Sequence, residues 1–338
     1  MRSLLPYLHQ VSDGKVLSRQ QAAETMDVLI DEPYPPEQAA MLLGALRARG
    51  ETVEELVGFA TALRRRSVSP PVRREGLVDT CGTGGDCAGT FNISTAAGLV
   101  AAAAGAGVAK HGNRAASSRC GSADVLEALG LRIDPPPEQT AAAIDSVGFG
   151  FLFAPMYHPV LRRLAPLRRA VGVRTVFNLL GPLLNPAPVQ RQLIGISDVR
   201  MARPLAAALR ELGVLEARVV AGADGMDELT LTGATHVVHL HAGCLNEMLI
   251  YPEDAGLVRC PSEALRGGGA SDNARLIESL LCGELHGPQR DVVTLNAAAL
   301  LQLAGCASGL RDGTFLVGEA LDGGHARQLL SRLREIHV

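Results

Sequence analysis

The chain has 338 residues, of which 47% are hydrophobic, so it can bury a sizeable core as two domains or as one large α/β domain. Its 32 basic and 35 acidic side chains give a formal net charge of -3, so no global basic field draws it to nucleic acid or anionic lipid. Aromatic residues make up only 3%, and tryptophan is missing, which leaves few surfaces on which bases could stack. The totals favour a packed globular protein.

The cysteines predict a reducing environment. They number seven, an odd count, and are scattered without any CxxC pair, so neither a disulfide framework nor a thiolate zinc site is indicated. The N-terminal stretch MRSLLPYLHQVSDGK lacks a long apolar region and a small-residue cleavage site, so we do not expect an export signal. A cytoplasmic location is expected. The cysteines are Cys81, Cys87, Cys120, Cys244, Cys260, Cys282 and Cys306.

The first part of the chain has helical patterns. Over residues 19–66, segments with a polar or proline start and apolar positions every three to four residues end in Arg or Gly. We therefore expect a small helical domain over residues 1–66. The Pro-rich, charged stretch 67–75 (SVSPPVRRE) predicts an extended hinge, and residues 76–79 (GLVD) predict a short strand.

An uncharged run over residues 93–109, ISTAAGLVAAAAGAGVA, has two interpretations. It is barely long enough to cross a bilayer, and its Ala and Gly contribute little transfer free energy, so a membrane span is disfavoured. Small side chains let neighbouring backbones approach closely, which favours a buried interior helix.

The rest of the chain alternates helical stretches with short apolar runs. The runs at 147–154, 191–197, 217–223 and 235–241 are bounded by Gly, Pro or Asp, as strands are. Strands that alternate with helices predict an α/β fold with a mainly parallel central sheet, here over residues 76–159 and 186–338. Residues 160–185 are again helix-like, and we expect them to pack onto the helical domain.

The stretch DTCGTGGDCAGTFNISTAAG (79–98) carries the clearest chemical signal. Glycines at 82, 84 and 85 permit positive φ and close backbone approach, so successive N–H groups can form a concave seat for phosphate in front of a helix N-terminus. The pattern is neither a Walker A motif nor GxGxxG, and a tight turn with a polar helix cap is the alternative. Cys81 and Cys87 are expected to be packing residues, not nucleophiles.

A second Gly- and Ser-rich segment follows at 110–124, KHGNRAASSRCGSAD, and carries fixed positive charge. Loops that follow neighbouring parallel strands meet at one sheet edge, where α/β folds bind ligands. By itself KHGNR would more often be a solvated turn. Together with the glycine loop, it favours contact with phosphate.

Acidic residues form a third segment. In GADGMDE (222–228), three carboxylates follow an apolar strand, and the adjacent Asp227 and Glu228 suit Mg²⁺, which prefers oxygen ligands. A solvated acidic turn is the plainer interpretation of this segment alone. Arg168 could bind a carboxylate with its planar guanidinium, although an Arg pair on a helix is usually a surface feature.

These motifs resemble those of the anthranilate phosphoribosyltransferase family of tryptophan biosynthesis. The resemblance covers nearly the whole chain and includes GTGGDCAGTFNIST, KHGNRAASSRCGSADVLEALG, RTVFNLLGPLLNP and DGMDELTLTG in order. It implies transfer of the 5-phosphoribosyl group from phosphoribosyl diphosphate to anthranilate with release of diphosphate. This reaction is the second step of tryptophan biosynthesis from chorismate. Mg²⁺ would be required, and the protein would be a homodimer, formed through its helical domain, with no nucleic-acid or membrane partner.

The resemblance also implies roles for individual residues. Diphosphate and ribose would be held by Gly82, Gly85, Asp86, Thr90, Asn92, Ile93, Ser94 and Thr95. The loop closing over the phosphoribosyl group would comprise Lys110, His111, Gly112, Asn113, Arg114, Ala115, Ala116, Ser117, Ser118 and Ser122. Asn113 and Arg168 would contact anthranilate, and Ser94, Asp227 and Glu228 would hold the metal.

Elementary chemistry agrees with this assignment. Displacement at the anomeric carbon passes through an oxocarbenium-like state, so stabilising the departing diphosphate matters more than activating the amine, and no general base is apparent. The chain departs from the family pattern at three positions, where the family usually has His, Gly and an acidic residue. They are Ala221, Cys87 and Ala170, and none is assigned to the chemistry.

Three other functions stay open at this stage. A pyrimidine nucleoside phosphorylase shares the implied architecture, but its phosphate loop carries a Lys-His pair that DTCGTGG lacks. A nucleic-acid-binding relative without activity is disfavoured by the charge balance. A transferase that uses a related aromatic amine cannot be distinguished by sequence from one that uses anthranilate, because the residues of the pocket wall determine which acceptor binds.

Overall fold

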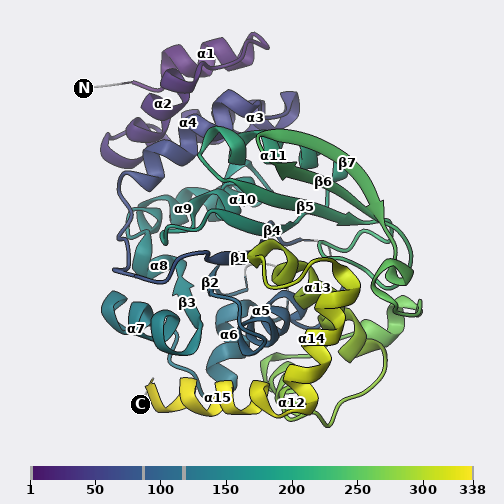
Figure 1. Cartoon of the computed structure of the whole chain (residues 1–338). Coiled ribbons are helices and arrows are strands. Elements are labelled where there is room, and N and C mark those ends of the chain that lie inside the picture. The colour runs from purple at the N-terminus through teal and green to yellow at the C-terminus, as the bar shows by residue number, and fades with distance from the viewer. Residues whose placement is uncertain (1–2, 86–87, 116–118, 337–338) are drawn as a thin grey trace.

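The computed structural model describes residues 3–85, 88–115 and 119–336 (Figure 1). The chain begins with four helices at one end of the molecule, as the helical patterns predict. Ser18 and Thr52 cap the second and fourth by accepting hydrogen bonds from the Gln21 and Glu55 amides. The helices are α1 (Leu5–Ser12), α2 (Arg19–Asp31), α3 (Pro36–Arg49) and α4 (Val53–Arg64).

A seven-stranded sheet in the order β3-β2-β1-β4-β5-β6-β7 forms the centre of the fold. The pairs from β3 through β5 are parallel, and β5–β6 and β6–β7 are antiparallel, so the predicted mainly parallel α/β fold is confirmed. The strands are β1 (Val78–Gly82), β2 (Val108–Gly112), β3 (Phe149–Phe153), β4 (Arg191–Gly195), β5 (Glu216–Gly222), β6 (Thr235–His241) and β7 (Cys244–Ile250).

Strand order reverses between β1 and β4, because β2 and β3 follow β1 on one side and β4 lies on the other. In open α/β sheets such a switch point separates the loops at the carboxyl ends of the two strands and leaves a crevice there. The glycine loop follows β1 directly. The sequence-predicted phosphate seat therefore lies at the switch point.

Helices cover both faces of the sheet (Figure 1). One apolar cluster joins the sheet to α5, α6 and α12–α15, and another joins its opposite face to α11 and the N-terminal helices. The helices after β1 are α5 (Ile93–Ala103), α6 (Ser122–Ala128), α7 (Pro137–Val147), α8 (Ala154–Tyr157), α9 (Leu161–Val171), α10 (Val176–Leu180), α11 (Ala202–Glu211), α12 (Ala270–Leu281), α13 (Pro288–Ala304), α14 (Leu310–Asp322) and α15 (His325–Ile336). Short 3-10 turns are η1 (Gly181–Leu184), η2 (Val199–Met201), η3 (Pro252–Ala255) and η4 (Ser262–Leu265).

The uncharged run at 93–109 is not one helix throughout. Helix α5 ends at Ala103, Gly105 takes a φ of +107°, and β2 then begins at Val108. The expected interior helix is confirmed for the first part of the run, and Lys110 to Gly112 lie on a strand where a loop was expected. None of the helices in the described ranges is both long and apolar enough to cross a bilayer.

Residues 160–185 form two helices and a turn, α9, α10 and η1, because Gly172 ends α9 at a φ of +65°. Helix α9 contacts α2 and α3, and α10 contacts α4. The division of the chain into domains at residues 67–75 stays a prediction, since one apolar cluster runs from the N-terminal helices onto the sheet.

Close packing of α2 on α4 gives a first testable prediction. A Cβ at Gly58 would overlap the Arg19 carbonyl oxygen and lie 2.7 Å from the Ala22 Cβ, whereas a Cβ at Gly44 in α3 meets nothing within 4 Å. We expect Gly58→Ala to lower the free energy of unfolding by about 1–3 kcal/mol through overpacking. Gly44→Ala should raise it by about 0.5–1 kcal/mol through helix propensity alone. Urea unfolding followed by circular dichroism checks both, and equal stabilisation by the two variants would contradict the packing argument.

Candidate functional site

A cavity of about 600 Å³ lies at the carboxyl ends of β1, β2 and β4, a size suited to a small-molecule ligand. Most of the sequence-predicted site residues within the described ranges line it. They are Gly82, Gly85, Thr90, Asn92, Ser94, Thr95, Lys110, His111, Gly112, Asn113, Arg114, Ala115, Ser122, Arg168, Asp227 and Glu228.

Five predicted residues stand apart from that set. Ile93 is fully buried in the apolar core and does not line the cavity, so only its backbone is available for a contact. Asp86, Ala116, Ser117 and Ser118 lie outside the residues that the structure describes, as does Cys87. Their assigned roles stay predictions.

The glycine loop bends sharply at the end of β1. Gly84 and Gly85 have φ values of +63° and +81°, a region that favours glycine. Arg174 donates hydrogen bonds from Nη1 to the Gly84 carbonyl and from Nη2 to the Thr83 carbonyl at 3.3 Å. A Cβ at Gly85 would overlap that guanidinium. The loop therefore needs glycine at both positions for the positive φ, and at Gly85 also for the close approach of Arg174.

Sequence reasoning missed Arg174 as a site residue. It lies between α9 and α10, and it lines the cavity. Arg47 of α3 donates a hydrogen bond to the Arg174 carbonyl, so Arg174 connects the helical segment to the glycine loop. The sequence feature that could have indicated its role is an arginine two residues after Gly172, in a turn between two helices.

Lys110 projects from β2 into the floor of the cavity. Its ammonium donates to the Thr80 carbonyl at 2.5 Å and lies 3.4 Å from the Ser94 hydroxyl. Burial lowers the pKa of Lys110, and the nearby Asp79 opposes that shift. An anion in the cavity would supply the charge partner that a buried ammonium needs.

Asp79 is a fully buried carboxylate beneath the site. It accepts hydrogen bonds from the His111 amide at 3.1 Å and from the Gln192 side chain at 3.4 Å. Burial raises its pKa to about 6, against the opposing influence of its hydrogen bonds and of Lys110. These contacts fix the backbone of β2 at the residue after Lys110.

His111 and His158 form a buried edge-to-face pair with ring centroids 5.3 Å apart. His111 Nδ1 lies 3.2 Å from the Gly181 carbonyl oxygen, so Nδ1 carries the proton in the neutral ring. Burial lowers the pKa of His111 to about 3, and the neighbouring His158 adds to the shift. His111 is therefore a neutral wall of the cavity at physiological pH.

Asp227 and Glu228 stand opposite the glycine loop. The Gly84 amide donates to Asp227 Oδ2 at 3.0 Å, and the Ser94 amide donates to Glu228 Oε1 at 3.2 Å. The third carboxylate of the acidic segment has a different role, because Asp224 accepts bonds from the Thr230 and Thr232 hydroxyls, each at 2.7 Å. Of the three carboxylates in this segment, Asp227 and Glu228 line the cavity and Asp224 does not.

Glycines at two strand ends leave the space that Asp227 occupies. A Cβ at Gly82 would lie 2.8 Å from Asp227 Oδ2, and a Cβ at Gly195 would overlap the Asp227 main chain. The Asp227 and Glu228 carboxylates and the Ser94 hydroxyl are hard oxygen donors of the kind that Mg²⁺ prefers. The donor set fits the predicted magnesium ion.

Arg168 and Arg114 line the same cavity but differ in their partners. Arg114 is ion-paired with Asp124 at 3.0 Å and with Glu127 at 2.9 Å, and these partners raise its pKa. Arg168 lies 5.6 Å from the Phe177 ring centroid, and burial lowers its pKa. Within the described parts of the chain, no carboxylate forms an ion pair with Arg168. Its guanidinium is the better candidate for a substrate carboxylate.

Comparison with known proteins agrees with this architecture. Models of the two domains of a glycosyl transferase family match the chain, the helical bundle domain over residues 5–67 and the a/b domain over residues 74–327. Fold and cavity thus define a glycosyl transferase with a helical bundle attached to an α/β domain.

Individual relatives narrow the class. Anthranilate phosphoribosyltransferase from Symbiobacterium thermophilum is 49% identical over 97% of this chain and 96% of its own. The crystal structure of the enzyme from Thermus thermophilus has a TM-score of 0.91 at 46% identity, covering 97% of this chain and 98% of that one. A Saccharomyces cerevisiae structure in complex with PRPP and Mg has a TM-score of 0.91 at 27% identity, covering 98% and 97%. The chain belongs to the anthranilate phosphoribosyltransferase family, which confirms the resemblance stated from its motifs.

The buried neutral His111 predicts a pH dependence of stability. Its pKa is about 3 in the folded chain and near 6.5 when unfolded, so the unfolded state binds the extra proton as pH falls below 6.5. Between pH 7.5 and 5.5 this group should remove about 1.4 kcal/mol of unfolding free energy.

Urea unfolding at both pH values checks this prediction. His111→Gln should lose less stability than the wild type over that interval, by about the same 1.4 kcal/mol. His286→Gln, a change at an exposed histidine, should leave the pH dependence as it was. An unchanged slope in His111→Gln would contradict a neutral buried ring.

Proposed function

We propose that this chain transfers the 5-phosphoribosyl group from phosphoribosyl diphosphate to the amino group of anthranilate, giving N-(5-phosphoribosyl)anthranilate and diphosphate. One observation supports the proposal most directly: a half-buried arginine, with no carboxylate ion-paired to it among the described residues, lines the same cavity as a glycine loop and a carboxylate pair. The 49% identity to a named anthranilate phosphoribosyltransferase over nearly the full chain supports it.

The chain's residues support departure of the diphosphate. As the bond from ribose C1 to the diphosphate oxygen breaks, negative charge grows on the leaving group and positive charge on the ribose ring. The glycine loop and Lys110 both line the cavity that would hold the leaving group, where a positioned ammonium needs little reorganisation to stabilise the growing charge. The anthranilate nitrogen then bonds to C1 and releases its proton to water.

Asp227, Glu228 and Ser94 would hold Mg²⁺ beside the glycine loop. When bound, the ion supplies positive charge that stabilises the departing diphosphate. A yeast relative crystallised with PRPP and Mg supports this part of the proposal. The amides of Gly84 and Ser94 already orient the two carboxylates, so the chain fixes their positions before an ion arrives.

Arg168 and Asn113 position the acceptor. The Arg168 guanidinium can bind the anthranilate carboxylate through two parallel hydrogen bonds, and its contact with Phe177 limits its motion. Holding the amine against C1 converts a bimolecular encounter into an intramolecular one, which supplies much of the rate enhancement. Neither residue needs to move a proton.

The organisation of the protein around this reaction is also proposed. Residues 1–66, with 160–185 packed on them, form the helical domain, residues 67–75 are the hinge, and 76–159 with 186–338 form the α/β domain. The family-model boundaries at residues 67 and 74 support this division. We expect a homodimer in the cytoplasm without a nucleic-acid or membrane partner, and the scattered cysteines support a reducing compartment.

Arg168 offers the direct test of the acceptor. We expect Arg168→Ala to lower kcat/KM for anthranilate about 100-fold by removing the charge-assisted contacts, with little change in KM for phosphoribosyl diphosphate. Anthranilate fluorescence followed over time measures the rate. The adjacent Arg169 is exposed, and Arg169→Ala is the matched control with near wild-type kinetics. Equal losses in the two variants would refute a specific carboxylate contact.

The carboxylate pair offers a test of the metal. Asp227→Asn should raise the Mg²⁺ concentration for half-maximal rate about tenfold or more, because one ionised ligand is lost. Asp224→Asn should leave that concentration unchanged, since Asp224 contacts Thr230 and Thr232 in the same turn. Rates across a magnesium titration, with EDTA as the blank, check both. A shift in Asp224→Asn alone would reverse the assignment.

A further inference from the structure

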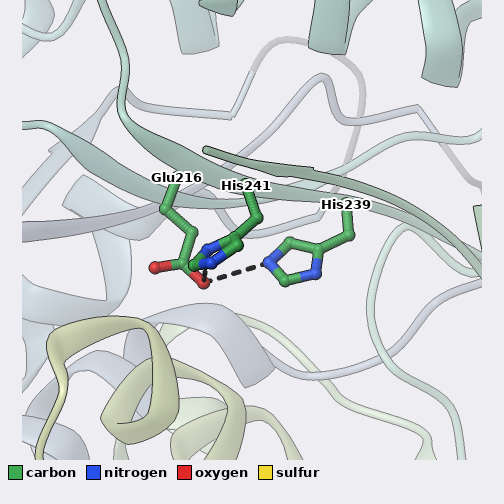
Figure 2. A group of neighbouring side chains, drawn as sticks. All are labelled: Glu216, His239 and His241. Carbon is green, nitrogen blue, oxygen red and sulfur yellow. Dashed lines mark hydrogen bonds and ion pairs between the residues drawn. The ribbon is translucent and has the colours of Figure 1, made fainter. Parts of the chain in front are cut away.

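A second group of ligand-type side chains lies on the sheet at the end of β5 remote from the cavity. Glu216, His239 and His241 point toward one another from β5 and β6 (Figure 2). The Glu216 Oε1 atom is 3.0 Å from His239 Nε2 and 3.4 Å from His241 Nδ1. One ligand atom from each residue lies within 4.8 Å of the others.

The sheet register produces this convergence. His239 and His241 are two residues apart on β6, so their side chains lie on the same face of the strand. Glu216 is the direct cross-strand partner of His241, and Arg218 is the partner of His239. Backbone hydrogen bonds of the β5–β6 ladder therefore hold all three ligands, and no loop is needed to position them.

We propose that Glu216, His239 and His241 form a binding site for a divalent first-row transition metal such as Zn²⁺. Two imidazoles and one carboxylate form a donor set that suits Zn²⁺, Co²⁺ or Ni²⁺, whereas Mg²⁺ prefers oxygen ligands throughout. Three protein ligands leave a fourth position for water. His241 is 62% exposed at its side chain, so solvent and an incoming ion reach the site.

The spacing of the ligand atoms fits tetrahedral coordination. With zinc–ligand bonds of about 2.1 Å, two ligand atoms at a tetrahedral angle are about 3.4 Å apart. The separations from the Glu216 oxygen to the two histidine nitrogens, 3.0 Å and 3.4 Å, are close to that value. An ion can therefore replace the present hydrogen bond and ion pair with small side-chain adjustments and no movement of the strands.

This site is distinct from the cavity. Glu216 begins β5 and Gly222 ends it, so the two lie about 20 Å apart along the strand. The carboxylates at the cavity follow the carboxyl end of β5, and the histidine cluster lies at its amino end. A metal at the cluster would join β5 to β6 and stabilise that edge of the sheet.

Neighbouring charges set the strength of binding. Arg218 is buried on the same face, and its Nε and Nη1 atoms have no hydrogen-bond partner among the described residues. Arg191 of β4 is the cross-strand partner of Glu216, and Cys244 of β7 is that of His241. A buried cation beside a dication weakens its binding, so the site is of moderate affinity, and neutralising Arg218 should strengthen it.

Metal binding by the whole protein tests the proposal. The metal-free chain is dialysed against Zn²⁺ in excess Mg²⁺, and bound zinc is counted. In parallel, Co²⁺ is added and its visible spectrum recorded. We expect the wild type to bind one more zinc than His239→Ala or Glu216→Gln, which should bind at least about tenfold more weakly at this site. Arg218→Met should bind more tightly than the wild type.

His236→Ala is the matched control. His236 lies on the same strand but faces the other side of the sheet, where it is 3.5 Å from Glu247. This variant and Cys244→Ser should keep the wild-type zinc count and cobalt spectrum. All variants should keep their transferase rate, which shows that they fold. Equal zinc binding by wild type and His239→Ala would overturn the proposal, and loss in Cys244→Ser would overturn the assigned donor set.

Discussion

The site depends on the close approach of the 222–228 turn to the ends of β1 and β4. Gly82 and Gly195 end these two strands without side chains, and Asp227 occupies the space that their Cβ atoms would fill. The Gly84 amide then bonds to the Asp227 carboxylate at 3.0 Å. Because the two strands flank the switch point, this contact places a candidate metal ligand beside a candidate phosphate seat.

Beneath that contact lies a set of buried polar groups that a purely structural protein would not need. Asp79 and Lys110 are both removed from solvent. Burial raises the pKa of Asp79 and lowers the pKa of Lys110, so it favours the neutral form of each group. Burying such groups is costly unless hydrogen bonds and opposite charges compensate. The His111 amide and the Thr80 carbonyl provide part of this compensation. A lysine side chain positioned by such contacts suits an anionic ligand whose charge grows during the reaction.

Much of the architecture follows from sequence patterns. The strands at 149–153, 191–195 and 235–241 fall within the predicted apolar runs, and the strand at 216–222 is offset from its predicted run by one residue, because buried strands leave short continuous apolar segments. Strand β7 was not predicted. Its sequence, CLNEMLI, is mostly exposed, and it follows a turn at Ala242 and Gly243, not the common Asn-Gly signal. Composition offered little evidence for such an edge strand.

The site was predictable in its residue types and less so in its contacts. Glycines, hydroxyls, Lys110 and the two carboxylates could be found because they lie at or just beyond the carboxyl ends of strands in the sheet. Arg174 was missed, since its contact with Gly84 links residues far apart in the chain and depends on how α9 and α10 turn. Ile93 was placed at the site by its motif alone, yet helix periodicity directs its side chain into the core.

Strand β5 carries a candidate metal site at each end, and the two sites differ in the atoms that they offer as ligands. At its carboxyl end, β5 leads into a turn whose carboxylates combine with a hydroxyl, a hard oxygen set suited to magnesium. At its amino end, the antiparallel partner β6 adds two imidazoles to one carboxylate. Parallel strands collect loop residues at one edge, whereas antiparallel pairing aligns side chains of neighbouring strands directly across from each other. The two candidate sites at the ends of β5 therefore differ in ligand chemistry, because one is built from loop residues beyond the strand and the other from side chains paired across β5 and β6.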